Sequence, residues 1–360
     1  METLVTTLNM YIMERWIVMS KIALAVKYRP KEWKDVVEQD STKAILQQQL
    51  DTGEYQHSYL FVGGAGTGKT TCARILANEI NNGEGTPIEL DAASNNGVDD
   101  VRNIIQQAKT KALDSEYKVF IIDECHSLSN TAWQAFLKLI EEPPAKSIFI
   151  FCTTNPEKIP KTILSRVQRY DFKRISTDGI IKRLAYILDE EDIHHYNAKD
   201  WLEGVTYIAK LADGGMRDAI TLMDKCLSYN SDLTIENIVK ALGVADYDIM
   251  VQLVSNIIYP DSAEIIKIIE DIHNSGKDLK QFIRQLINFV LDIKKYIILK
   301  SYDYINIPHT DWAEGFLGQM EEDEDKVTDL LDLLIKINSE IKYDSSPKYM
   351  IEAMLIGELK

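Results

Sequence analysis

Four residues within the stretch 57–71 have types and spacing that suit phosphate chemistry. Gly63, Gly68, Lys69 and Thr70 satisfy the pattern G-x-x-x-x-G-K-[ST]. In such a loop, glycines let backbone N–H groups turn toward phosphate oxygens, the lysine reaches the β- and γ-phosphates, and the hydroxyl ligates Mg²⁺. The pattern predicts an ATP site whose loop comprises Gly63, Gly64, Ala65, Gly66, Thr67, Gly68, Lys69, Thr70 and Thr71.

A glycine turn with an unrelated lysine is the alternative interpretation of this loop. The sequence around the loop argues against it, because a strand-like run at 59–62 precedes the glycines and a helix-like run at 72–77 follows them. The positive end of that helix would face the phosphates. The context therefore favours a nucleotide site.

A pair of acids supplies the other half of the predicted chemistry. Asp123 and Glu124 end an apolar run at 118–122. Asp123 would hold Mg²⁺ through water, and Glu124 would polarise the water that attacks the γ-phosphate, since phosphoryl transfer needs positioning and charge compensation rather than a nucleophilic triad. Taken alone, the two acids could equally be structural. Together with the phosphate loop they predict hydrolysis.

Both features require a scaffold that brings distant segments together. Four segments in the first half of the chain have strand character: 59–62, 118–122 and 148–152, which are mostly apolar, and 88–90, which is a probable strand. Helical patterns lie among them at 41–50, 98–111 and 130–140, the first with Asp40 and Ser41 as the expected cap. This alternation predicts an α/β domain, a parallel sheet covered by helices on both faces. Its carboxyl edge would gather Gly63, Asp123, Glu124 and Thr154.

The strand signal fades beyond Phe172, and the rest of the chain is predicted to be helical. Helical patterns at 180–190, 201–212, 217–229 and 235–242 indicate a small bundle, and longer helices follow from 245. We expect a variable N-terminal extension at 1–20, a P-loop domain at 21–175, a helical lid at 176–243 and an all-α domain at 244–360.

Charge and composition exclude several classes of protein. The net charge of −16 argues against a protein that coats nucleic acid through a general positive field. Residues 244–360 hold 12 basic and 22 acidic side chains, so any DNA contact is expected in the first two thirds. The four cysteines form no C-x-x-C pair, which indicates a reducing compartment. Without an apolar run of ~18 residues or a secretory signal, we expect a cytoplasmic protein that spans no membrane.

Seven motifs occur in an order and spacing that resemble one family. They are Tyr28-Arg29-Pro30, the phosphate loop, Asp91-Ala92-Ala93-Ser94, Asp123-Glu124-Cys125-His126, Glu141-Glu142-Pro143-Pro144, Ser165-Arg166 and Gly215-Met216-Arg217-Asp218. This set is similar to the bacterial clamp-loader ATPases, the gamma/tau subunits of DNA polymerase III, which are AAA+ proteins. The resemblance covers about Lys21 to Leu359. It implies an AAA+ domain, a helical lid and a C-terminal collar that joins subunits.

The resemblance also assigns roles to single residues. Arg166 resembles an arginine finger that reaches the ATP of a neighbouring subunit, Thr154 resembles sensor 1, and Arg217 resembles sensor 2. Tyr28, Arg29 and Val37 resemble part of the adenine pocket. The implied DNA contacts are Ser94, Asn95, Asn96, Gly97, Arg102 and Asn130, at the starts of two helices, where exposed N–H groups bind phosphate without reading sequence. Ordinary helix caps remain the alternative for these positions.

Two departures from the family pattern carry expectations of their own. The segment 81–87 stands where the family usually has a four-cysteine zinc module, so we expect no zinc. Val167 replaces the usual cysteine after Ser165-Arg166 and leaves the arginine intact. The chain also ends where a short, gamma-like form would end, without the tail that tethers helicase and polymerase.

The resemblance implies an ATPase that opens a sliding clamp and loads it on primer–template DNA. The implied partners are further clamp-loader subunits, both copies of itself and delta- and delta-prime-like chains, together with the clamp and DNA of any sequence. A bacterial cell is the expected setting, or host cytoplasm if the chain is phage-encoded. The alternatives are an AAA+ helicase or branch-migration motor and a non-hydrolysing scaffold subunit. The helical pattern after Phe172 disfavours a helicase with a second sheet-containing lobe.

Overall fold

The computed structural model describes residues 22–112, 114–193, 197–242, 246–344 and 346–357, so the predicted extension at 1–20 lies outside the described residues. The chain divides into two compact units. The first comprises residues 1–194 and 208–225, and the second comprises residues 195–207 and 226–360. The region predicted as a lid, 176–243, is thus shared between both units, and the three domain boundaries remain a prediction.

A parallel sheet forms the centre of the first unit, as predicted, and it has five strands. Its strands are β1 (Ser58–Gly63), β2 (Ile88–Asp91), β3 (Lys118–Asp123), β4 (Ser147–Thr153) and β5 (Gln168–Phe172). They lie in the order β2-β3-β4-β1-β5, so that β4 separates β1 from β3. All seven residues of β4 are buried, because helices cover both of its faces. This explains why its sequence is continuously apolar.

The edge strand β5 was not predicted. Gln168, Arg169 and Asp171 are exposed along it, whereas Tyr170 and Phe172 are buried. Arg169 and Asp171 also form an ion pair on the exposed face. This alternation marks a half-buried strand, but it is only five residues long and lacks the apolar run of the central strands.

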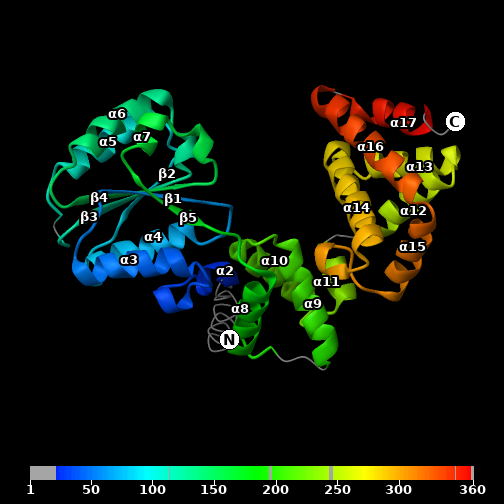
Figure 1. Ribbon diagram of the computed structural model, residues 1–360, viewed down its shortest axis with the longest axis horizontal. Helices are drawn as coiled ribbons and strands as arrows, with labels where there is room; N and C mark the ends of the chain where they lie inside the picture. The colour runs from blue at the N-terminus through cyan, green and yellow to red at the C-terminus, as the bar shows by residue number, and fades with distance from the viewer. Residues whose placement is uncertain (1–21, 113, 194–196, 243–245, 345, 358–360) are drawn as a thin grey trace, which may run out of the picture. The chain divides into compact units, whose positions relative to one another are not determined.

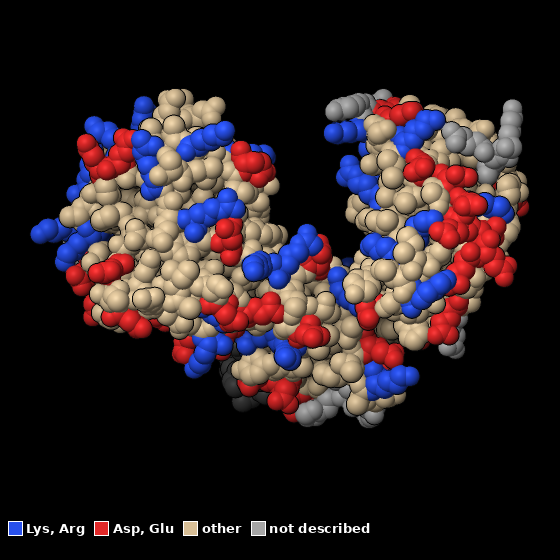
Figure 2. Space-filling model, in the orientation of Figure 1, with Lys and Arg blue, Asp and Glu red and all other residues tan. Residues whose placement is uncertain are grey.

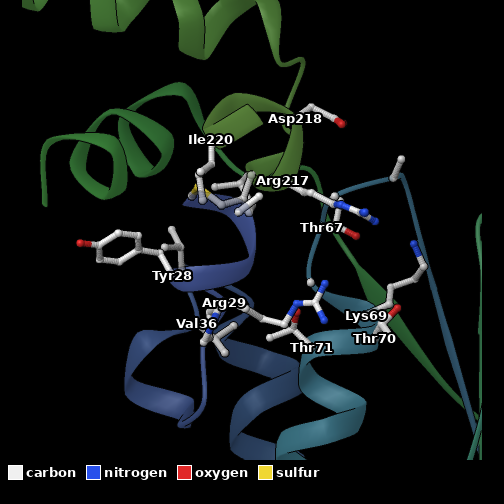
Figure 3. A pocket seen from close by; sticks show the side chains of 18 of the residues that line it. Tyr28, Arg29, Val36, Thr67, Lys69, Thr70, Thr71, Arg217, Asp218 and Ile220 are labelled. Atoms are coloured by element: carbon white, nitrogen blue, oxygen red, sulfur yellow. The ribbon is translucent and has the colours of Figure 1, made fainter. Parts of the chain in front are cut away.

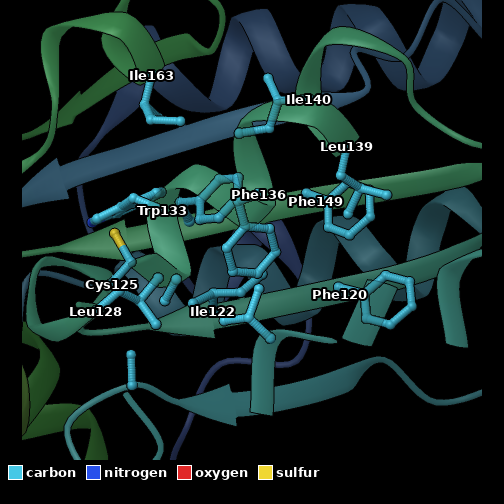
Figure 4. Packing of buried hydrophobic residues seen from close by; sticks show 14 of the residues in the cluster. Phe120, Ile122, Cys125, Leu128, Trp133, Phe136, Leu139, Ile140, Phe149 and Ile163 are labelled. Carbon is cyan, nitrogen blue, oxygen red and sulfur yellow. The ribbon is translucent and has the colours of Figure 1, made fainter. Parts of the chain in front are cut away.

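Two helical layers enclose the sheet (Figure 1). One face is covered by α3 (Asp40–Thr52) and α4 (Lys69–Ile80), and the other by α5 (Val98–Ala108), α6 (Asn130–Glu141) and α7 (Lys161–Leu164). On the second face the rings of Phe120 and Phe149 stack with centroids 5.0 Å apart (Figure 4). The ring of Phe136, from α6, meets that of Phe151 edge-on with centroids 5.3 Å apart. The Phe136 contact therefore helps to hold α6 on the sheet.

The start of α3 differs from the prediction. Asp40 and Ser41 were expected to cap this helix, but Asp40 is its first helical residue, and no side chain caps it. The N-cap is Gln39, which has left-handed backbone angles, φ 58° and ψ 28°. Its side chain instead bonds both the N–H and the C=O of Lys173. The Gln39 side chain therefore holds the segment that follows β5 and does not cap α3.

The remaining elements are helices, which confirms the prediction for the chain beyond Phe172. They are α2 (Leu24–Lys27), α8 (Thr177–Glu190), α9 (Ala198–Leu211), α10 (Met216–Tyr229), α11 (Ile235–Leu242), α12 (Asp246–Ile258), α13 (Ser262–Asn274), α14 (Leu279–Leu299), α15 (Asp311–Glu322), α16 (Glu324–Glu340) and α17 (Pro347–Gly357). In the second unit, α14 packs along α16 through buried residues such as Leu286 and Leu334. Acidic side chains are prominent on the visible face of these helices (Figure 2).

No single helix among the described residues is long and apolar enough to cross a bilayer. One sharply bent pair, Ile235–Leu242 with Tyr247–Ile258, meets the criterion on length and composition alone.

Removal of the Phe136 ring tests the packing of α6 on the sheet. Phe136 is fully buried, so Phe136→Ala should lower the free energy of unfolding of the first unit by roughly 3–5 kcal/mol through lost burial and a cavity. Gln134→Ala, on the exposed face of the same helix, should change it by less than about 0.5 kcal/mol. Denaturant titration of both variants measures the difference. Equal stability of the two would show that α6 is not held by this ring.

Candidate nucleotide site

A cavity of about 260 Å³ lies at the carboxyl edge of the sheet and is lined by residues 65–71 of the phosphate loop, whereas Gly63 and Gly64, also predicted to bind ATP, do not line it. The loop begins where β1 ends and leads into α4 at Lys69. Gly66 and Gly68 have φ of +68° and +100°, a backbone region that residues other than glycine rarely adopt. Thr67 closes the turn by donating from Oγ1 to the Gly64 carbonyl at 2.9 Å. The backbone of the loop therefore favours glycine at Gly68, a position of the predicted pattern, and at Gly66.

Lys69 is held inside this loop. It is only 6% exposed, and its Nζ donates to the carbonyls of Gly63 at 2.9 Å and Gly64 at 2.8 Å. Burial lowers the pKa of Lys69, although nearby acids, Glu124 and Asp123 among them, act in the opposite direction. The Gly63 and Gly64 carbonyls that accept from Lys69 are neutral, so the ammonium charge of Lys69 is available to phosphate oxygens.

The residues predicted to hold magnesium are brought together from two elements. Thr70, in the first turn of α4, donates from Oγ1 to Asp123 Oδ2, at the end of β3, at 2.7 Å. Mg²⁺ prefers oxygen ligands, and in nucleotide sites it takes one or two from the protein and the rest from phosphates and water. The hydroxyl and carboxylate therefore fit Mg²⁺ bound with a nucleotide. Among the described residues, no group of three or more His, Cys, Asp or Glu side chains could hold a metal without other ligands.

Glu124 follows Asp123 in an unusual backbone conformation. Its φ of 45° is left-handed, which costs a non-glycine residue about 1–3 kcal/mol and is frequent at functional sites. The Glu124 N–H donates to Asp123 Oδ1 at 3.0 Å, and Thr154 Oγ1 donates to Glu124 Oε2 at 3.1 Å. The sheet thus brings Gly63, Asp123, Glu124 and Thr154 to one edge. Thr154 contacts the acid rather than lining the cavity itself.

The segment before α3 forms one wall of the cavity. Tyr28, Arg29 and Val37, which were predicted to form part of an adenine pocket, all line the cavity. The hydroxyl of Tyr28 donates to Glu191, and burial together with this contact raises the pKa of Tyr28. Figure 3 shows the guanidinium of Arg29 directed toward the phosphate-loop side, away from the Tyr28 ring. Burial and the charge of Arg217 are among the causes that lower the pKa of Arg29.

The opposite wall comes from α8 and from the start of α10. Arg217 lines the cavity (Figure 3), and the preceding residue, Met216, donates its N–H to the Gly66 carbonyl at 3.0 Å. A Cβ on Gly66 would lie 2.9 Å from Gly215 Cα. The phosphate loop and the segment carrying Arg217 are therefore in direct backbone contact.

Sequence reasoning missed several residues that line the cavity. They are Ala25, Pro30, Asp35, Val36, Ile175, Arg183, Met216, Asp218 and Ile220. Arg183, for example, donates to the Tyr28 carbonyl at 3.1 Å across 155 positions of sequence. Pro30, Val36, Met216 and Asp218 adjoin residues that were singled out, so neighbourhood could have found them. For Ile175, Arg183 and Ile220 no motif gave a signal.

Arg166 lies outside the cavity of its own chain. It follows the short helix α7, and its Nε pairs with Glu141 Oε1 at 2.8 Å. A guanidinium nitrogen also donates to the Thr162 carbonyl at 2.8 Å. The Arg166 side chain is 39% exposed, so its charge lies at the surface rather than at the nucleotide pocket of the same chain.

The predicted DNA contacts lie at two adjacent helix starts. The loop 94–97 leads into α5, and Ser129 precedes α6; the Ser129 N–H donates to the Asn96 carbonyl at 3.2 Å. Much of the local polar capacity is already used. Ser94 donates to Asp91, Arg102 pairs with Asp99, and Ser129 caps α6 through the Ala132 N–H. Asn130 opens α6 without an acid in its first turn.

Comparison with known proteins agrees with this architecture. A family model described as DNA polymerase III, delta subunit, matches residues 86–176. Another, described as DNA polymerase III subunits gamma and tau domain III, matches residues 233–357. Among solved structures, the RuvB Holliday junction branch migration motor of Thermotoga maritima has a TM-score of 0.50 at 18% identity, covering 70% of this chain and 86% of that one. That likeness shows the AAA+ fold alone.

Relatives with known names match nearly the whole chain. DNA polymerase III subunit tau of Bacillus subtilis is 33% identical over 371 residues, covering 94% of this chain and 63% of that protein. DNA polymerase III subunit gamma/tau of Mycobacterium tuberculosis is 33% identical and covers 84% of this chain and 55% of that protein. The chain thus spans between half and two thirds of these relatives. Its motifs, both matched regions and these relatives identify a protein similar to the gamma/tau subunits of DNA polymerase III.

Proposed function

We propose that the chain is an ATPase subunit of a clamp loader, which places a ring-shaped sliding clamp on primer–template DNA during replication. The observation that carries this proposal is the single cavity that gathers the phosphate loop, the acids Asp123 and Glu124, and Arg217. The relatives, named as subunits of a DNA polymerase, support the connection to replication.

Each group in the cavity has a role in the proposed hydrolysis of ATP. Lys69 and the loop N–H groups would bind the phosphate oxygens, and Thr70 and Asp123 would hold Mg²⁺, which would supply charge neutralisation at the phosphates. Glu124 accepts a proton from the attacking water as the water oxygen bonds to the γ-phosphorus and the bond to ADP breaks. Thr154 orients Glu124 through its hydrogen bond, and Arg217 adds positive charge beside the phosphates.

The final charge is proposed to come from a second subunit. Arg166 does not line its own cavity, and its surface position suits contact with the ATP of a neighbour. A guanidinium supplied in this way offsets the charge that develops on the γ-phosphoryl group, an effect worth ~10³-fold or more in comparable enzymes. Hydrolysis would then depend on assembly.

The proposed partners follow from this dependence. They are further loader subunits, copies of this chain and delta- and delta-prime-like chains among them, as well as the sliding clamp and DNA of any sequence. The helix starts at Ser94–Gly97 and Asn130, with Arg102, are the proposed DNA contacts. We expect no zinc requirement, since segment 81–87 contains neither cysteine nor histidine. The cytoplasm is the expected location.

The same fold is compatible with two other functions. A scaffold subunit that does not hydrolyse ATP would typically lack a complete phosphate loop, but here Lys69, Thr70, Asp123 and Glu124 are all present and placed together. A branch-migration motor shares the fold, as the RuvB structures show, but likeness at 18% identity carries no information on activity.

Clamp placement distinguishes a loader from a motor. The chain, assembled with its partner subunits, should place the clamp on primed DNA only when ATP is present. The same complex should cause no measurable unwinding of forked DNA. Retention of labelled clamp on primed circles and strand displacement on forks measure the two activities. Strong unwinding without a clamp would refute the loader proposal.

Replacement of Glu124 separates binding from hydrolysis. Glu124→Gln should bind ATP normally but lower turnover by ~10²-fold or more, because the amide cannot accept the proton from water. ATP titration and phosphate release measure the two steps, with Lys69→Ala as the non-binding reference. Glu157→Gln, an exposed glutamate beyond β4, should behave like the unaltered protein. Near-normal turnover in Glu124→Gln would rule out Glu124 as the base.

Replacement of Arg166 tests the contribution from a neighbouring subunit. Arg166→Ala should keep ATP affinity but lower the turnover of the assembled complex by ~10³-fold, because the charge is lost at the adjacent site. Turnover in complexes mixed from Arg166→Ala and Lys69→Ala subunits would show which site is affected. Arg169→Ala, at an exposed ion pair on β5, serves as the control. Loss of ATP binding by the altered chain itself would contradict a role in a neighbouring site.

A further inference from the structure

His126 contacts Glu124, the predicted base, on the side chain of that residue. The proposed loader mechanism gives His126 no role. The short helical turn η2 (Cys125–Ser127) follows Glu124 and turns the chain back against β4. The imidazole is 14% exposed. Its Nδ1 lies 3.2 Å from Glu124 Oε2 and 3.2 Å from Thr153 Oγ1. This nitrogen therefore joins the strand end of β4 to the carboxylate.

The two oxygens of Glu124 have different surroundings. Oε2 is contacted both by Thr154 Oγ1 at 3.1 Å and by His126 Nδ1 at 3.2 Å. No hydrogen bond involves Oε1 within the part of the chain that the structure describes. Two contacts on one oxygen restrict rotation of the carboxylate and leave the other oxygen for water. Glu124 lines the cavity, and its Oε1 is therefore an oxygen of a carboxylate at the nucleotide site.

The surrounding hydrogen bonds allow Nδ1 to carry the proton. Thr153 Oγ1 accepts the Asn155 N–H at 3.0 Å, and a hydroxyl oxygen can accept a second hydrogen bond. An ionised carboxylate only accepts, so Nδ1, 3.2 Å from Glu124 Oε2, bonds this oxygen as an N–H. A charged carboxylate is a stronger acceptor than a hydroxyl, so an Nδ1–H between the two is drawn toward Glu124.

We propose that His126 is a positioning residue for Glu124. Its Nδ1–H donates to Oε2 and, together with Thr154, fixes the carboxylate so that Oε1 meets the attacking water. This inference rests on the proposed role of Glu124 as the base. It predicts that His126 affects the chemical step and not the binding of ATP, since His126 does not line the cavity.

Two substitutions at His126 distinguish positioning from simple packing. His126→Leu keeps an apolar group of similar bulk but has no donor, and should lower kcat about tenfold, the effect of one hydrogen bond to a charged group. His126→Asn places an amide near the position of Nδ1 and should keep most of the turnover. ATP affinity and the melting temperature should match those of the unaltered protein in both variants. His57→Leu, at an exposed histidine before β1, is the control.

A combined variant separates this inference from the proposed function. In a Glu124→Gln background, His126→Leu should cause no further loss of turnover, because the carboxylate that it positions is absent. Three results would overturn the inference: unchanged kcat in His126→Leu, an equal loss in His126→Asn, or a full additional loss in the combined variant. If Glu124→Gln alone hydrolyses ATP normally, the proposed function itself fails, whatever the histidine variants do.

Discussion

The hydrogen bond between Thr70 and Asp123 depends on a strand to which neither residue belongs. Thr70 follows β1, Asp123 ends β3, and β4 lies between these two strands. Two strand spacings amount to ~9.6 Å, which the phosphate loop and the first turn of α4 must span for the 2.7 Å contact to form. The position of β4, buried on both faces, therefore sets the geometry of the magnesium ligands. The aromatic packing of Phe149 and Phe151 under α6 thus contributes to the site as well as to stability.

A second constraint joins the phosphate loop to the segment that carries Arg217. The Met216 N–H bonds the Gly66 carbonyl, and a side chain at Gly66 would collide with Gly215. Gly66 therefore serves two purposes: it provides a left-handed turn, and it lets another backbone approach. A movement of the phosphate loop on nucleotide binding would therefore displace the start of α10. This contact gives a physical route by which the occupied cavity and the helices beyond β5 influence each other.

How much of this was predictable depends on what kind of signal each residue carries. Gly63, Lys69, Asp123 and Glu124 could be predicted, because a phosphate loop and a strand-end acid pair have fixed spacing and their strands are continuously apolar. The edge strand β5 was missed because only Tyr170 and Phe172 face the core. The prediction that Asp40 caps α3 was wrong, because the preceding Gln39 is the N-cap, adopts a left-handed conformation and bonds Lys173. Arg183 and Ile220 reach the cavity only through tertiary packing, which no local pattern encodes.

The two arginines assigned by resemblance differ in how tightly their own chain holds them. Arg217 lines the cavity and follows a residue fixed to the phosphate loop, so its position is set within the subunit. Arg166 pairs with Glu141, and both side chains are about 40% exposed, at 39% and 44%. Such surface pairs contribute only about 0–1 kcal/mol, so exchange of Glu141 for a phosphate of a neighbouring subunit would cost little. A cation that completes another site must be easily released by its own chain. The exposed Arg166–Glu141 pair meets that requirement, whereas the groups around Lys69 are placed to act within their own chain.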